Sequence, residues 1–429
     1  MGIRAQSGLG RVAPGRRVIA AVLITVGAAV SGWAVQSPAP PTSDTQAARW
    51  RADLDYLATQ LAAGEDPQAF DADQVRFSRD IAALQAQAAS ASNDQMIVGI
   101  LEAVASFGVA HTQLYVPPFP TYPIKLDLFG DGFHVVDATS PYKNLLGALL
   151  VRIGDTPAQV AYQRVSTVIS HENQARLAYV APKYLTIPTI LDGLGILTNG
   201  HDDLTFRTLS GTTLTVSLPA VPYGQYPPLD QLVTHPPLYL QHLDEPFWFT
   251  YLPAEQTLYV RYLDCTDPAG FAALTDQVFA LAATHPVQRL VVDLRQNEGG
   301  DTAVFAPFLQ RLQTSPLDHA GRLYAVIDQG TFSSGMDTAI ELASAGATLI
   351  GSPTGGKPDS YGEIGTFTLP NSRLTFSYAT QYFQAAAPGT DPASLMPSIT
   401  IQPTFAQYAA GEDPVMNAIL ATVPAGRSS

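Results

Sequence analysis

The feature that most constrains the fold is an alternation of short apolar segments with helical patterns over residues 240–425. The stretch FWFTYLPAEQTLYVRYLD is typical of a β-hairpin, and the apolar segments RLVVDLR, RLYAVID and ATLIG come after it. A helical pattern precedes each of these three segments, over residues 268–284, 302–313 and 334–345 in the same order. Short apolar strands that alternate with helices favour a mainly parallel sheet with right-handed crossovers. We therefore predict an α/β core over 240–425.

Polar, glycine-rich segments follow three of these predicted strands: RQNEGGD, QGTFSSG and GSPTGGKPD. Parallel α/β sheets bind ligands beyond the carboxyl ends of their strands, so we expect these segments to meet at one functional site. Ser333 and Ser334 begin the helix that follows the second segment. Ser334, with Asp337 three residues later, fits a helix-capping box, and this interpretation competes with that of a serine nucleophile.

Residues 1–36 are predicted to be a signal peptide or a membrane anchor. The uncharged run VIAAVLITVGAAVSGWAV follows a lead with four arginines and no acidic residue, and a polar, Pro-rich linker over 37–45 comes after it. A run of about eighteen residues is at the border between a signal-peptide core and a membrane span. We expect either cleavage near Ala34 or anchoring through residues 18–35. Positive charge before the run predicts an extracytoplasmic protein, periplasmic or secreted.

Charge and composition exclude several classes of partner. The chain has a formal net charge of -14, and beyond its first 36 residues 19 basic residues stand against 37 acidic ones. Such an acidic surface argues against binding to nucleic acid. The single cysteine, Cys265, leaves no cysteine-based metal site, and the eight histidines lack metal-ligand spacing. We predict neither a metal nor a cofactor. Few lysines beside abundant alanine and arginine are typical of a GC-rich bacterial genome.

Two further units are predicted before the core. Residues 46–115 repeat apolar positions at helical spacing and should form a helical unit. Residues 116–222 change to strand-like alternation and should form a small α+β unit. Within it we expect hairpins in YPIKLDLFGDGFHVVDA and DLTFRTLSGTTLTVSLPAV, a strand, turn and helix in ALLVRIGDTPAQVAYQRV, and helices over 171–183 and 187–195. The segment VPYGQYPPLDQLVTHPP is interpreted as a linker.

Five motifs, in order along residues 98–425, resemble those of the C-terminal processing, or tail-specific, serine proteases. This superfamily includes the tricorn core protease and the repeats of interphotoreceptor retinoid-binding protein. VVDLRQNEGGD is similar to its D-L-R-x-N-x-G-G turn, QGTFSSGMDTAIELA to its G-T-x-S helix, and TLIGSPTGGK to its V-G-E-x-T-x-G-K loop. LLGALLVRIGDTPAQVA resembles a shortened PDZ carboxylate-binding part, and GVAHT resembles the D-x-H-T segment. The resemblance implies a ClpP/crotonase-like core preceded by a PDZ-like unit.

By this resemblance Ser333 is the nucleophile. Ser334 would supply the next backbone N–H to the oxyanion, and Gly299 or Gly300 the second donor, where no side chain blocks the backbone. A serine at a helix start also faces the positive end of the helix dipole.

The resemblance leaves two candidates for the general base. Tail-specific members use a lysine, which aligns with Lys357, and tricorn-like members use a histidine, which aligns with His111. We favour His111, because an ordinary imidazole titrates near neutral pH. Val109 stands where the family often has an acid, and Tyr361 where lysine-type members have a glutamine. Rough alignment gives Asp391 as the orienting acid, with Glu363 as the alternative.

The sequence therefore predicts an exported serine-type endopeptidase that hydrolyses peptides or unfolded proteins through an acyl-enzyme. The alternative is a catalytically inactive member that binds a peptide or an apolar ligand in the cell envelope. A crotonase-like acyl-CoA enzyme shares the sheet architecture but fits poorly with export and with the acidic surface.

Overall fold

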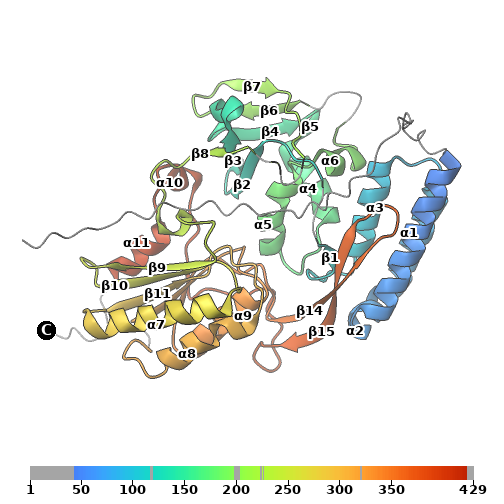
Figure 1. Ribbon diagram of the computed structural model, residues 1–429. Helices are drawn as coiled ribbons and strands as arrows, with labels where there is room; N and C mark the ends of the chain where they lie inside the picture. Colours follow the sequence, from blue (N-terminus) through green and yellow to red (C-terminus); the bar gives the residue numbers. More distant parts are fainter. Residues whose placement is uncertain are drawn as a thin grey trace, which may run out of the picture. The chain divides into compact units, whose positions relative to one another are not determined.

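The computed structural model describes residues 43–115, 119–197, 203–222, 225, 227–318 and 321–422 (Figure 1). The predicted leader, 1–36, and most of the linker, 37–45, lie outside them. Thr42–Ser429 forms one compact unit, so the boundaries predicted at 46–115, 116–222 and 240–425 stay predictions. No helix in the described ranges is long and apolar enough to cross a membrane.

A six-stranded sheet forms the core of the C-terminal half and confirms the predicted α/β class. Its strands lie in the order β16-β13-β12-β11-β10-β9. Neighbouring strands pair in parallel, except for the β9–β10 hairpin. The strands are β9 (Phe247–Leu252), β10 (Thr257–Tyr262), β11 (Arg289–Asp293), β12 (Leu323–Ile327), β13 (Thr348–Gly351) and β16 (Ile399–Thr400).

Helices cover both faces of this sheet, because alternate strand residues point to opposite sides. In β10, Leu258 and Val260 pack toward one cluster of apolar side chains, whereas Tyr259 packs toward another. The first cluster includes residues of α7 (Pro268–Thr284), the 3-10 turn η4 (Thr302–Phe305), α8 (Ala306–Leu312) and α9 (Ser334–Ser344). The second includes residues of α11 (Pro414–Ala421), which follows α10 (Phe405–Ala409).

Residues 43–105 of the described chain form three helices, where the sequence has apolar residues at helical spacing: α1 (Ser43–Gly64), α2 (Pro67–Gln87) and α3 (Asn93–Ala105). Helix α3 begins with a complete capping box, in which the Ser92 hydroxyl accepts the N–H of Gln95 and the Gln95 side chain accepts that of Ser92. These helices share one apolar cluster with the α+β unit that follows them, and this shared core fixes the end of α3 against the rest of the chain.

The α+β unit has an antiparallel sheet in the order β2-β3-β4-β6-β7, with β5 and β8 paired to its strands. Part of the predicted linker is ordered, since Leu229–Gln231 forms β8 and pairs with β3. The other elements are β2 (Ile124–Phe129), β3 (Gly132–Thr139), η1 (Ser140–Leu145), β4 (Leu149–Ile153), β5 (Thr156–Pro157), α4 (Ala158–Val165), η2 (Ser166–Val168), α5 (Gln174–Tyr184), α6 (Pro188–Gly193), β6 (Leu204–Arg207) and β7 (Thr213–Val216).

A third sheet was not predicted. A hairpin of β14 (Asp359–Thr368) and β15 (Thr375–Gln384) pairs with the short strand β1 (Gln113–Leu114). Buried and exposed positions do not alternate regularly along β14, so the sequence lacks the usual strand signal there. The pairing matters because β1 directly follows the motif GVAHT.

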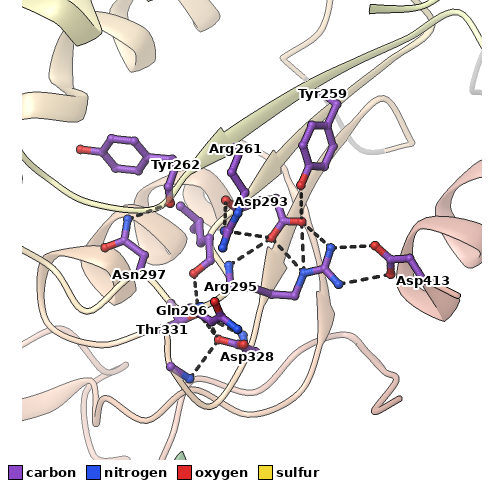
Figure 2. A network of polar contacts seen from close by, with 12 residues as sticks. Tyr259, Arg261, Tyr262, Asp293, Arg295, Gln296, Asn297, Asp328, Thr331 and Asp413 are labelled. Atoms are coloured by element: carbon purple, nitrogen blue, oxygen red, sulfur yellow. Dashed lines mark hydrogen bonds and ion pairs between the residues drawn. The ribbon is translucent and has the colours of Figure 1, made fainter. Parts of the chain in front are cut away.

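A buried polar network holds the loop that leaves β11 (Figure 2). Arg295 contacts the carboxylate of Asp293 and makes a paired contact with Asp413, at 3.2 and 2.9 Å. The Tyr259 hydroxyl donates to Asp293 at 2.8 Å, and Arg261 donates to the Asp293 carbonyl at 3.1 Å. Burial alone would raise the pKa of Asp293, but Arg295 and Arg261 outweigh it and lower that pKa. Asp293 therefore stays ionised inside the protein.

Replacement of Asp293 by alanine should lower the free energy of unfolding by about 3–5 kcal/mol, because it leaves the buried Arg261 without a carboxylate and Arg295 with that of Asp413 alone. The matched control is Asp276→Ala, which breaks the exposed pair between Asp276 and Arg311 (3.0 Å) and should cost about 1 kcal/mol or less. Urea unfolding of both variants measures the difference. Equal losses would contradict the role given to the buried network.

Candidate active site

Ser333 lies at the carboxyl end of the sheet, between β12 and α9. Its backbone has φ 52° and ψ -132°, a conformation that costs energy for a residue with a side chain. The neighbouring N–H of Phe332 donates to the carbonyl of Asn297 at 2.9 Å and so fixes this turn. The Ser333 hydroxyl makes no capping bond to the helix. It lies instead 3.1 Å from Nε2 of His111.

Ser334 has a different role from the one that the capping box predicted. Helix α9 begins at Ser334 itself, and its hydroxyl donates to the carbonyl of Gly300 at 2.8 Å. A second bond, of 2.9 Å, joins it to the hydroxyl of Thr302. The capping interpretation is therefore wrong. The side chain of Ser334 instead fixes residues 297–300, which follow β11 and are called the glycine loop below.

The glycine loop brings backbone amides to Ser333. Gly299 has φ 104°, and a Cβ on it would lie 2.7 Å from the Cβ of Ser333, so only glycine fits there. Its own N–H is already bound, at 2.9 Å, to the side-chain oxygen of Asn297. The N–H groups of Gly300 and Ser334 have no acceptor within the described part of the chain. Of the two predicted glycines, Gly300 is thus the one with a free donor.

Hydrogen bonds from Cys265 and Asn297 fix the conformation of this loop. Asn297 is fully buried and donates to the carbonyl of Tyr262, at the end of β10, at 2.9 Å. The N–H of Cys265 donates to Gly299 (3.1 Å), and its carbonyl accepts from Asp301 (2.8 Å). Burial raises the pKa of the Cys265 thiol to about 11, so this side chain is inert at neutral pH.

His111 lies in the loop between α3 and β1. Its ring stacks on Phe332, with centroids 4.5 Å apart, and its carbonyl accepts from the hydroxyl of Ser377 in β15 at 2.7 Å. Burial and, to a smaller extent, the charge of Arg176 lower the pKa of His111 to about 4, while the backbone of Tyr361 acts in the opposite sense. The imidazole is therefore neutral at pH 7 and can accept a proton.

A buried carboxylic acid supports the residue next to His111. The hydroxyl of Thr112 donates to Glu65 at 2.8 Å and accepts from the N–H of Ala379 at 3.1 Å. Burial raises the pKa of Glu65 to about 7, against the weaker effects of Thr112 and Ala379. Glu65 thus joins the end of α1 to the loop of His111.

Lys357 and Asp391 lie apart from this arrangement. Their side chains form an ion pair of 2.7 Å, in which Asp391 is 70% exposed. No hydrogen bond or ion pair between either residue and Ser333 or His111 occurs among the described residues. The structure therefore brings together Ser333, Ser334, His111, Gly299 and Gly300 but not the lysine and the acid that the sequence also suggested.

Glu172 is a residue near the site that sequence reasoning missed. One of its carboxylate oxygens accepts the N–H of Ala110, the residue before His111, at 3.2 Å. The pair is 62 positions apart in the sequence, and Glu172 lies in no family-like motif. Its sequence neighbourhood, SHENQ, gave no signal beyond the charge itself.

Two cavities adjoin the glycine loop. One, of about 890 Å³, is lined by residues of β2, α5 and the loop after β11. A smaller one, of about 430 Å³, reaches Gly299. Leu243, Gln296 and Glu298 line both, so the two cavities meet at these residues. The described residues contain no cluster of side chains suited to a metal ion.

The raised pKa of Glu65 predicts a pH-dependent stability. Between about pH 4.5 and 7 the folded protein keeps the proton of Glu65, while the unfolded chain loses it, so this group's stabilisation falls as the pH rises. The full effect is up to about 3 kcal/mol. Glu65→Gln should therefore become more stable, relative to the wild type, from pH 4.5 to pH 8. Urea unfolding at both pH values tests this, and an unchanged difference would contradict it.

Comparison with known proteins supports the fold. No protein-family model and no curated protein matches the sequence. The structure of mature CPAF matches with a TM-score of 0.56 at 13% identity, over 87% of this chain and 96% of that one. Mature CPAF complexed with lactacystin gives 0.60 at 12% identity, over 87% and 98%. The photosystem II D1 C-terminal processing protease gives 0.39 at 12%, over 85% and 98%. Since the CPAF structures match over 96–98% of their own length, the chain has the fold of mature CPAF.

Proposed function

We propose that this protein is a serine endopeptidase that hydrolyses peptides or unfolded proteins. The observation that carries the proposal is the 3.1 Å contact between the Ser333 hydroxyl and Nε2 of His111. A serine in a strained turn, a neutral histidine within hydrogen-bonding reach and two free amides beside it are the parts that acyl transfer requires.

In the proposed reaction, Ser333 Oγ attacks the carbonyl carbon of the scissile peptide bond while its proton passes to Nε2 of His111. The N–H groups of Ser334 and Gly300 donate to the oxyanion that forms. His111 then gives its proton to the leaving amine, and the C–N bond breaks to leave an ester on Ser333. Water, deprotonated by His111, hydrolyses this ester and restores the hydroxyl. Lys357 takes no part.

The two adjoining cavities support a polymeric substrate. They meet at Gln296 and Glu298, next to the glycine loop, and the larger has the volume of a typical ligand pocket. The linings of the two cavities do not include Ser333 or His111, but the smaller one reaches Gly299, where a Cβ would lie 2.7 Å from the Cβ of Ser333. We also propose, from residues 1–36 alone, that the protein acts outside the cytoplasm, either released or anchored by residues 18–35.

A second candidate function is binding without catalysis. Val109 and Tyr361 depart from the family pattern, and the cavity of about 890 Å³ would accommodate a peptide or an apolar ligand. In that case Ser333 would be unreactive, and an apolar ligand would purify with the folded protein.

Treatment with a fluorophosphonate should modify Ser333, because the probe reacts with serines that a neighbouring base activates. Peptide mass spectrometry of the protein should locate one adduct per chain. Ser333→Ala should abolish the adduct, whereas Ser334→Ala should keep it and lower the labelling rate, through the loss of the bond to Gly300. An adduct on Ser334 would move the nucleophile by one residue. No adduct on a folded sample would favour the binding function.

The general base is tested by comparing His111→Ala with Lys357→Ala. Loss of His111 should lower the labelling rate at pH 8 by about 10²-fold or more, as expected for loss of a general base. Loss of Lys357, which pairs with Asp391, should change it by less than about 3-fold, since exposed ion pairs contribute little. The opposite order of effects would make Lys357 the base.

A further inference from the structure

Three polar atoms near His111 are shielded from solvent and have no hydrogen-bond partner within the described residues. They are Nδ1 of His111 itself, Oε2 of Glu172 and Nε of Arg176. Buried polar atoms nearly always have a partner, since an unsatisfied one costs about 1–3 kcal/mol. Nδ1 of an imidazole whose Nε2 accepts a proton must carry a hydrogen, and a carboxylate oxygen is an acceptor. Nδ1 of His111 and Nε of Arg176 are donors, and Oε2 of Glu172 is the one acceptor among these three atoms.

Glu172 is held firmly next to the loop of His111. Its other oxygen accepts the N–H of Ala110 at 3.2 Å. Asn173, the next residue, caps α5 by accepting the N–H of Arg176 at 2.8 Å. The Asn173 amide also donates to the carbonyls of Gly355, at 3.1 Å, and Ala393, at 2.8 Å. The carboxylate thus lies between the loop of His111 and the loop that carries Lys357.

We propose that Glu172 is the positioning residue of His111. This inference rests on the proposed peptidase function. The ionised carboxylate keeps the proton on Nδ1, so that Nε2 faces Ser333 as an acceptor. When Nε2 takes the proton of Ser333, the negative charge of Glu172 stabilises the imidazolium, and Glu172 itself neither gains nor loses a proton.

The other acids near the site are less well placed. Asp391, the acid that alignment suggested, forms its ion pair with Lys357 and is largely exposed. Both carboxylate oxygens of Glu65 lie 2.8 Å from the hydroxyl of Thr112, so neither is left without a partner. The backbone of Tyr361 is close enough to raise the pKa of His111, but it makes no hydrogen bond of normal geometry with Nδ1 of that ring. Glu172 alone among these groups has a free, shielded carboxylate oxygen.

The surroundings of Glu172 place its ionisation near neutral pH. Burial raises the pKa of Glu172 to about 7, while the N–H of Ala110 and the charges of Arg176 and Lys357 act in the opposite sense. Below this pH the carboxyl is neutral and cannot support the imidazolium. His111, whose own pKa is lowered by burial, would by itself limit the reaction only in acid. A rate that rises with pH through about 7 is therefore the signature of Glu172.

The test is the second-order rate of fluorophosphonate labelling of Ser333 between pH 5 and pH 9, which needs no knowledge of the substrate. In the wild type the rate should rise through about pH 7. In Glu172→Gln it should fall by about 10²-fold at pH 8, and the rise near pH 7 should disappear. Glu172→Asp, which keeps the charge, should retain a pH-dependent rise. Circular dichroism and urea unfolding check that each variant is folded.

Two controls separate Glu172 from the neighbouring acids. Glu65→Gln removes the other carboxyl near His111 that titrates close to pH 7, and Asp391→Asn removes the acid suggested by alignment. Both should keep the rise near pH 7. The proposal is overturned if Glu172→Gln keeps the wild-type profile, or if the rise is lost in Glu65→Gln or Asp391→Asn instead. Absence of labelling in the wild type would refute the peptidase function itself, which is a different outcome.

Discussion

The paired contact of Arg295 with Asp293 and Asp413 is the interaction on which the rest of the site depends. Asp293 ends β11, and Asp413 also caps α11 through the N–H groups of Val415 and Met416. The guanidinium group of Arg295 thus joins β11 to the start of α11, which packs on the face of the sheet opposite α7, α8 and α9 (Figure 2). The glycine loop begins two residues after Arg295, and the network fixes where it starts. A planar guanidinium suits this position because it can bond to two carboxylates at once.

Hydrogen bonds connect the glycine loop to the turn that holds Ser333. Asn297 binds the N–H of Gly299 and, through its carbonyl, the N–H of Phe332. Ser334 then returns a bond to Gly300. The loop after β11 and the turn after β12 therefore hold each other, and the strained backbone of Ser333 lies between them. Strain of this kind persists only where the surrounding contacts determine the conformation, as they do here.

Much of the fold could be predicted from the sequence, because the core follows local rules. Helix α7 has the predicted bounds, 268–284, since Asp267 caps it and Pro268 occupies its first position. The hairpin of β14 and β15 was missed because its residues lack regular alternation. Ser333 and His111 were found from motif order, and the structure adds their distance. Glu172 could not be found, because a contact across 62 residues between a side chain and a backbone N–H leaves no local pattern.

The two members of the proposed dyad belong to different hydrophobic cores. The residues that flank His111, Val109 and Leu114, pack with the N-terminal helices and the α+β unit. Those that flank Ser333, Ile327 and Ala339, pack with the helices on one face of the parallel sheet. Ser333 therefore meets its proposed base only where the two cores pack against each other. In the proposed peptidase, activity would therefore report on the packing between the two cores and not only on the folding of either one.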